Sequence, residues 1–267
     1  MPQPPREPMT SAAKPRPLGR ATLIGAGPGD PELLTLKALK ALQQADVILY
    51  DKLVNPAILE LARGGARRID VGKRCGRHPL SQTAINRLLL EHARAGAHVV
   101  RLKGGDPSLF ARGGEEIAAL RAAGVAVEIV PGISAAFAAA ASLGVPLTHR
   151  GIARSLHLVA GHGQDDEGLP AHDWQALARS GGTLAVYMGT RTLPELAACL
   201  LEAGMAPGTP VVATENASLP DERRIEANLA GIVAAVTAAG LKGPTLILIG
   251  DVLSLVAVET ILERDAA

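Results

Sequence analysis

Apolar residues recur along this chain in two alternating patterns. Short runs of Ile, Leu, Val and Ala, as at residues 21–25 and 98–102, lead into glycine-containing segments, which is typical of buried strands. Between such runs the apolar residues return every three or four positions, as at Leu33, Leu36 and Leu39, which predicts amphipathic helices. The first half is predicted to form strands at 21–25, 46–50, 68–71, 98–102 and 126–130 and helices at 32–44, 56–63, 81–95 and 114–123.

The second half alternates in a similar but less regular way. A helix of small residues is expected at 134–143, followed by an extended crossing segment at 146–150. The remaining elements are expected to be strands at 155–159, 183–188, 210–214 and 245–249 and helices at 173–179, 194–203 and 228–239. Because a helix between two strands returns the chain to the same end of a sheet, the first half predicts a parallel sheet. The predicted fold class is α/β, with two α/β domains, a mostly parallel N-terminal sheet, a mixed C-terminal sheet and a cleft between them.

The expected domain division is a disordered leader at residues 1–17, an N-terminal α/β domain at 18–131 and a C-terminal α/β domain at 132–267. The leader is indicated by its six prolines and by the absence of an apolar run that could serve as a signal peptide. Apolar stretches elsewhere fall short of the roughly 20 residues that a membrane span needs, so no membrane partner is expected.

Composition narrows the class of partner. Phe, Trp and Tyr make up 2% of the 267 residues, which argues against nucleic-acid binding by aromatic stacking, and the net charge of +1 gives no general attraction to nucleic acid. The two cysteines, Cys75 and Cys199, cannot form the disulfide framework of a secreted domain, so a cytoplasmic location is expected. We expect no metal site, because no group of residues has the spacing of metal ligands.

Three glycine-containing motifs each follow a predicted strand. They are Gly25-Ala-Gly-Pro-Gly-Asp30, Lys103-Gly-Gly-Asp-Pro107 and Val130-Pro-Gly-Ile-Ser-Ala-Ala136. Because glycine lets a ligand approach the backbone closely, these strand ends predict a small-molecule site. Each motif also has a purely structural interpretation: a tight turn for the first, an Asp in a turn for the second, and a helix N-cap at Ser134 for the third.

These motifs, together with Arg101-Leu-Lys-Gly-Gly-Asp-Pro-Ser-Leu-Phe-Ala-Arg-Gly-Gly-Glu-Glu116, resemble the S-adenosylmethionine-dependent tetrapyrrole methylase family from about residue 19 to about residue 253. The segments Asp51-Lys-Leu-Val54 and Gly72-Lys-Arg74 are most similar to the members that act on uroporphyrinogen III. The resemblance implies a C-methyltransferase that converts uroporphyrinogen III to precorrin-2 by two methyl transfers, for sirohaem or cobalamin biosynthesis. S-adenosyl-L-methionine would be the methyl donor and S-adenosyl-L-homocysteine the product.

The resemblance also assigns roles to individual residues. It places the proton acceptor at Asp51 and the proton donor at Lys73. The substrate carries several carboxylates, for which Arg74, Arg112 and Arg150 are the expected cationic partners and Lys103 a further candidate. The expected cofactor contacts are Pro28, Gly104, Gly105, Asp106, Leu109, Ser134, Ala135, Met188, Ala217 and Thr245.

Other interpretations stay open at this point. The chain could methylate a later corrin intermediate, because related enzymes share the fold, or it could be a non-catalytic S-adenosylmethionine-binding module. A dinucleotide-dependent oxidoreductase is disfavoured, because Pro28 interrupts the glycine fingerprint that such enzymes need. A homodimer is implied by the resemblance, with a small-molecule tetrapyrrole as the partner.

Overall fold

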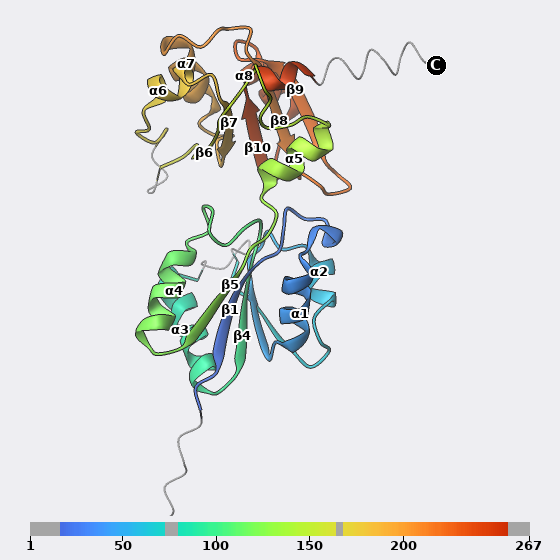
Figure 1. The fold of residues 1–267 in the computed structure, drawn as a ribbon, viewed down its shortest axis with the longest axis vertical. Coiled ribbons are helices and arrows are strands. Elements are labelled where there is room, and N and C mark those ends of the chain that lie inside the picture. Colours follow the sequence, from blue (N-terminus) through green and yellow to red (C-terminus); the bar gives the residue numbers. More distant parts are fainter. Residues whose placement is uncertain (1–16, 73–79, 164–167, 256–267) are drawn as a thin grey trace, which may run out of the picture.

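The computed structural model describes residues 17–72, 80–163 and 168–255, and these form two lobes stacked along the long axis of the molecule (Figure 1). Each lobe is built on a five-stranded sheet. The last strand of the first sheet ends at Val130, and the first strand of the second sheet begins at Leu156. The predicted domain boundary at residue 131 lies between these strands and stays a prediction. Except for Pro17, the predicted leader lies outside the described residues.

The sheet of the first lobe has the order β3-β2-β4-β1-β5, and all its pairings are parallel. Its strands are β1 (Arg20–Gly25), β2 (Val47–Tyr50), β3 (Arg67–Asp70), β4 (His98–Lys103) and β5 (Ala126–Val130). One face is covered by α1 (Leu36–Gln44) and α2 (Pro56–Glu60), the other by α3 (Gln82–Arg94) and α4 (Gly113–Ala122) (Figure 1). β4 is buried along its whole length, because helices cover both faces of the sheet.

The helix expected at 32–44 is divided into two pieces. A 3-10 turn, η1 (Pro31–Leu33), comes first, and α1 begins only after Leu34, whose backbone is extended. Two separate caps explain the break, because Asp30 accepts a hydrogen bond from the N–H of Glu32 and Thr35 accepts one from the N–H of Ala38.

The sheet of the second lobe has the order β6-β7-β10-β8-β9, with one parallel pairing and three antiparallel ones. Its strands are β6 (Leu156–Ala160), β7 (Thr183–Tyr187), β8 (Pro210–Glu215), β9 (Arg223–Asn228) and β10 (Thr245–Ile249). One face packs against α5 (Ala135–Leu143) and η2 (Asp251–Leu255), the other against α6 (Trp174–Arg179), α7 (Leu193–Glu202) and α8 (Ile232–Ala239). The predicted fold class, with a mixed C-terminal sheet, is confirmed.

Three local predictions in this lobe are wrong. The helix expected from Asn228 begins at Ile232, because residues 223–228 form the unpredicted edge strand β9. The expected extended segment at 146–150 bends and runs into a turn at residues 149–153, which an isolated bridge between His149 and Ala153 closes. β7 ends one residue before Met188. Among the described residues no helix is long and apolar enough to cross a membrane.

Candidate functional site

The first sheet changes its direction of winding between β1 and β4. These strands are neighbours, yet β1 leads to α1 on one face of the sheet and β4 to α4 on the other (Figure 1). In parallel α/β sheets such a reversal leaves a crevice at the carboxyl ends of the two strands, and ligands bind there. The first two glycine motifs begin at these two strand ends.

Backbone atoms of the three glycine motifs are in direct contact at this crevice. Gly27, which directly precedes Pro28, exchanges two backbone hydrogen bonds of 3.2 and 2.7 Å with Gly105. A Cβ atom on Gly25 would lie 2.6 Å from the Cα of Gly132, so this position has no room for a side chain. Gly105 has a φ of +66° and its absent side chain would face open space. A ligand can therefore approach the backbone of Gly105 closely.

Asp106 joins the second motif to the third. One of its carboxylate oxygens accepts a hydrogen bond of 2.7 Å from the N–H of Ser108, and the other accepts one of 3.0 Å from the N–H of Gly132. The N–H of Leu109 is bonded to the carbonyl of Asp106, which closes the loop into a turn. The structural interpretation of this Asp is thus confirmed, and its side chain also fixes the spacing of the two loops.

Ser134 stands immediately before α5, but its side chain makes no capping hydrogen bond. Its hydroxyl lies 2.7 Å from that of Tyr187, which also accepts a hydrogen bond of 3.1 Å from the N–H of Ala136. Ser134 therefore stands at the predicted N-cap position, but its hydroxyl does not cap α5, because a side chain from β7 binds the helix start instead. Burial raises the pKa of Tyr187, so its hydroxyl is neutral at physiological pH. Ala135 lies between the two groups that Tyr187 binds.

The predicted cofactor contacts of the second lobe lie at one edge of its sheet. Because β10 is antiparallel to both β7 and β8, the end of β7, the end of β8 and the start of β10 are neighbours. Met188, Ala217 and Thr245 follow or begin these strands. Met188 has a φ of +56° and is 43% exposed, and Asn216 and Ser218 have φ values of +54° and +71°. Such backbone conformations are uncommon outside glycine and concentrate at functional sites.

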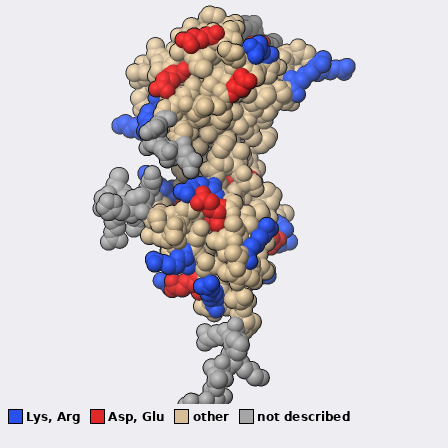
Figure 2. Space-filling view, turned by 90° about the vertical axis from the view of Figure 1, so that its left-hand side faces the viewer, with Lys and Arg blue, Asp and Glu red and all other residues tan. Residues whose placement is uncertain are grey.

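This edge of the second lobe faces the crevice of the first. The N–H of Asp30 donates a hydrogen bond of 3.1 Å to the hydroxyl of Ser218, and Asn55 binds the carbonyl of Gly29 beside it. In Figure 2 the surface is indented between the lobes, and charged side chains gather just below the indentation. The structure therefore brings the predicted cofactor contacts of both lobes to one region between them.

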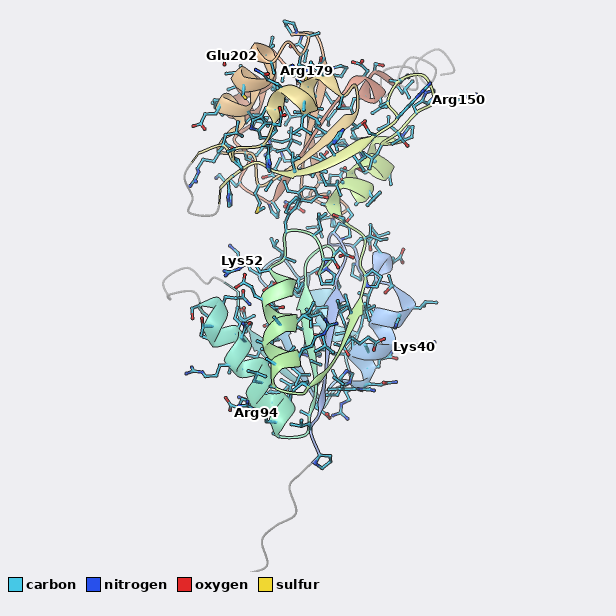
Figure 3. The ribbon with its side chains drawn as sticks, turned by 60° about the vertical axis from the view of Figure 1, so that its left-hand side comes forward. Lys40, Lys52, Arg94, Arg150, Arg179 and Glu202 are labelled. Carbon is cyan, nitrogen blue, oxygen red and sulfur yellow. The ribbon has the colours of Figure 1, made fainter. Side chains whose placement is uncertain are left out.

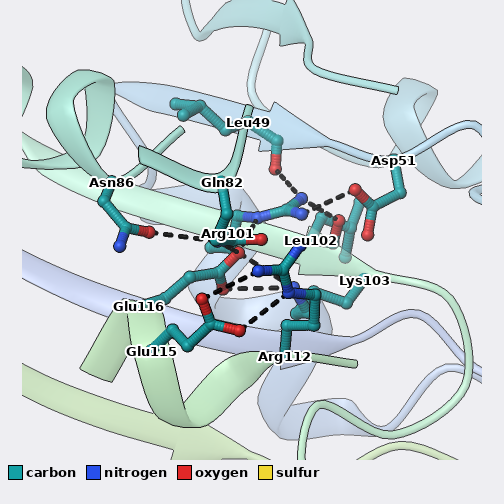
Figure 4. A network of polar contacts seen from close by, with 10 residues as sticks. All are labelled: Leu49, Asp51, Gln82, Asn86, Arg101, Leu102, Lys103, Arg112, Glu115 and Glu116. Carbon is teal, nitrogen blue, oxygen red and sulfur yellow. Dashed lines mark hydrogen bonds and ion pairs between the residues drawn. The ribbon is translucent and has the colours of Figure 1, made fainter. Parts of the chain in front are cut away.

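Asp51, the predicted proton acceptor, follows β2 and lies at the margin of a buried ionic network (Figure 4). Its Oδ1 accepts a hydrogen bond of 2.6 Å from Nη2 of Arg101. Glu116 accepts one of 3.0 Å from Nε of Arg101 and two of 3.0 and 3.1 Å from Nζ of Lys103. The side chains of these last three residues are at most 3% exposed, whereas that of Asp51 is 30% exposed. Asp51 is therefore the member of the network that a ligand can reach.

Lys103 does not offer its charge to a substrate, contrary to the expectation from the sequence. Its ammonium group is buried and donates hydrogen bonds to both carboxylate oxygens of Glu116. Burial lowers the pKa of Lys103, the nearby Arg101 lowers it further, and Glu116 opposes both effects. The role of Lys103 is therefore internal to the first lobe.

After β3 the backbone passes close to the segment that follows Asp51. A Cβ atom on Gly72 would lie 3.1 Å from the Cα of Lys52, so the backbone that leads to residue 73 touches the backbone that follows Asp51. Lys73 and Arg74 themselves lie outside the described residues. A Cβ atom on Gly104 would lie 2.9 Å from the Cβ of Leu53, so the same segment also adjoins the second glycine motif.

The two remaining substrate candidates lie in different places. Arg112 is exposed at the start of α4 and pairs with both carboxylate oxygens of Glu115, at 2.7 and 2.9 Å (Figure 4). Arg150 lies at the far edge of the second lobe, whereas Lys52 lies on the margin of the first lobe that faces the second (Figure 3). Within this chain the structure does not bring Arg150 to the region between the lobes.

Four polar residues of this region were not singled out from the sequence: Arg101, Glu115, Glu116 and Tyr187. Arg101 could have been identified from the sequence, because it interrupts an apolar strand and a cation inside a buried strand requires a buried anion. The sequence shows no comparable signal for Tyr187. Among the described residues no group of three or more His, Cys, Asp and Glu is placed to hold a metal ion.

Known proteins are similar to this chain over most of its length. Residues 20–233 match the model of the family described as Tetrapyrrole (Corrin/Porphyrin) Methylases. Uroporphyrinogen-III C-methyltransferase of Pseudomonas aeruginosa is 52% identical over 234 residues, which cover 88% of this chain and 94% of that protein. Siroheme synthase of Chromobacterium violaceum is 49% identical over 89% of this chain. The chain spans only 50% of that longer protein.

A solved structure has the same arrangement of elements. It is the crystal structure of uroporphyrin-III C-methyltransferase from Thermus thermophilus in complex with S-adenosyl homocysteine. It is 44% identical to this chain and superimposes with a TM-score of 0.75, over 89% of this chain and 100% of that one.

Proposed function

Because the chain belongs to the tetrapyrrole (corrin/porphyrin) methylase family, we propose that it converts uroporphyrinogen III to precorrin-2 by two S-adenosylmethionine-dependent methyl transfers. The observation that carries this proposal is the 52% identity to the Pseudomonas enzyme over nearly all of that protein. The product would serve sirohaem or cobalamin biosynthesis. The proposal concerns only the activity of the part of the siroheme synthase that this chain matches, which is 50% of that protein.

The residues between the lobes fit S-adenosylmethionine. Its amino-acid part carries an ammonium and a carboxylate, for which the open backbone at Gly104 and Gly105 and the carboxylate of Asp106 are suitable partners. The exposed thioether of Met188 and the backbone around Ala217 suit the flat, less polar adenosyl part. Pro28, Leu109, Ser134, Ala135 and Thr245 complete the proposed cofactor contacts.

S-adenosylmethionine, when bound, supplies an electrophilic methyl group to an electron-rich pyrrole carbon. Forming the new carbon–carbon bond leaves a proton that the protein must remove, and we assign its acceptor to Asp51. Oδ2 is the accepting atom, because Oδ1 is bonded to Arg101. We assign proton donation to Lys73, and contacts with the substrate carboxylates to Arg74 and Arg112. In this arrangement Glu115 orients the guanidinium of Arg112.

The proposed function is tested by incubating the purified protein anaerobically with uroporphyrinogen III and methyl-labelled S-adenosylmethionine. We expect label in the tetrapyrrole and a product mass that corresponds to two added methyl groups. Cofactor binding without transfer would overturn the substrate assignment and favour a later corrin intermediate or a non-catalytic binding module.

Asp106→Ala should weaken binding of S-adenosylhomocysteine by at least about tenfold. The substitution removes a carboxylate, the hydrogen bond from Gly132 that joins the second and third motifs, and the bond from Ser108 within the loop of the second motif, and such bonds contribute about 1 kcal/mol or more each. Isothermal titration calorimetry measures the effect. Asp173→Ala is a matched control, because Asp173 also binds a backbone N–H but caps α6. Unchanged affinity in Asp106→Ala would remove this residue from the cofactor site.

We further propose a homodimer, located in the cytoplasm. The proposed contact surface is a groove of about 520 Å³ beside α5, whose lining includes Leu33, Ile133 and Phe137. Phe137 is 53% exposed, and an exposed aromatic ring beside an apolar groove is typical of an interface.

Phe137→Glu should shift the protein from dimer to monomer, because it would bury two charges at the proposed contact. Light scattering after size-exclusion chromatography measures the mass. Leu18→Glu serves as the control, since Leu18 is 50% exposed near the start of β1. A monomeric wild type, or a dimer that persists in Phe137→Glu, would contradict the proposed surface.

A further inference from the structure

Tyr187 contacts two segments that carry proposed cofactor residues and belongs to a third. Its hydroxyl lies 2.7 Å from that of Ser134 and accepts a hydrogen bond from the N–H of Ala136. Its ring packs against Phe110 with the centroids 5.1 Å apart and the planes tilted by 53°. Met188, with its left-handed backbone, follows it directly. One side chain thus links β7, the start of α5 and the loop after β4.

Tyr187 packs partly against the core of the second lobe, but its contact with Phe110 lies outside that core. Phe110 is 42% exposed and has a φ of +50°, so its ring is held at the surface between the lobes. The helix α5 would ordinarily be capped by its own Ser134, which has the right backbone conformation for a cap. Instead, Tyr187 binds the start of α5 with its hydroxyl and packs against Phe110 with its ring. It thereby aligns groups of the two lobes with each other.

We propose that Tyr187 is a positioning residue for cofactor binding, holding Ser134, Ala135 and the loop of Leu109 at the spacing that S-adenosylmethionine requires. This inference rests on the proposed function. Tyr187 acts through these neighbours, by preorganising them before the ligand arrives. Its loss should therefore weaken cofactor binding and leave binding of the tetrapyrrole unaffected.

The test is Tyr187→Phe, which removes the hydroxyl and keeps the ring that packs on Phe110. We expect the Kd for S-adenosylhomocysteine, measured by calorimetry, to rise about fivefold to twentyfold, since two hydrogen bonds are lost. The KM for S-adenosylmethionine should rise similarly, while the KM for the tetrapyrrole stays within about twofold of the wild-type value. Thr237→Val is the control, because it removes a hydroxyl that only binds the carbonyl of Val233 within α8.

A double variant separates positioning from a general loss of stability. If Tyr187 acts partly through Ser134, then the loss of affinity in Ser134→Ala combined with Tyr187→Phe should be smaller than the sum of the two single losses. Additive losses, or a wild-type Kd in Tyr187→Phe, would overturn the inference and leave the proposed function intact. Failure of the wild-type protein to bind S-adenosylhomocysteine would overturn the proposed function together with the inference.

Discussion

Asp51→Asn should lower the rate of methyl transfer at least about 100-fold and leave S-adenosylhomocysteine binding unchanged. The amide keeps an oxygen that can accept the hydrogen bond from Arg101, so the buried network should stay in place. It cannot take up a proton, however, and a positioned general base typically contributes about 10²- to 10⁴-fold to a rate. The effect should therefore fall on kcat and hardly on the KM for either substrate.

The measurement is label transfer to uroporphyrinogen III under anaerobic conditions. Asp46→Asn is a matched control from the other end of β2, where Asp46 also pairs with an arginine and accepts a hydrogen bond from the N–H of His98. That variant should turn over at the wild-type rate. Wild-type turnover in Asp51→Asn would exclude Asp51 as the proton acceptor.

Local patterns in the sequence were sufficient to predict the sheet of the first lobe. The inner strands β1, β2 and β4 are buried apolar runs, because helices cover both faces of the sheet and packing agrees with local preference, whereas the edge strand β3 is polar and partly exposed. The three glycine motifs could be found for a related reason. Gly25 and Gly132 touch each other, so the backbone contact itself demands glycine.

Features that depend on long-range contacts could not be predicted in this way. β9 reads Arg-Arg-Ile-Glu-Ala-Asn, and its polar character reflects an edge position that is defined only once β8 is in place. The pairing of Ser134 with Tyr187 spans 53 positions of the chain. The burial of Lys103 likewise depends on Glu116, which reaches it from α4.

Glu116→Gln should lower the free energy of unfolding by about 3 to 5 kcal/mol, because it breaks a buried ion pair by removing one partner. The Glu116 carboxylate is fully buried and serves both Arg101 and Lys103, so its loss leaves two buried cations of which, among the described residues, only Arg101 is still paired with a carboxylate, that of Asp51. Urea unfolding at pH 7 measures the loss.

The pH dependence of this loss has a definite sign. Burial already lowers the pKa of Lys103, and Glu116 is a partner that raises it, so the variant should lower the pKa of Lys103 further. The unfolded chain then binds more protons than the folded one below the ordinary lysine pKa, and stability must rise with pH in that range. The deficit of Glu116→Gln should therefore shrink between pH 7 and pH 10.

A charge-balanced variant provides the decisive comparison. Adding Lys103→Met to Glu116→Gln removes the excess cation and should restore most of the lost stability at pH 7. Nε of Arg101 would then meet a neutral amide oxygen, a weaker acceptor than the carboxylate, so the double variant should fold well and yet transfer methyl groups more slowly, through a less well-placed Asp51. Wild-type turnover in a stable double variant would mean that the buried network stabilises the first lobe without orienting Asp51.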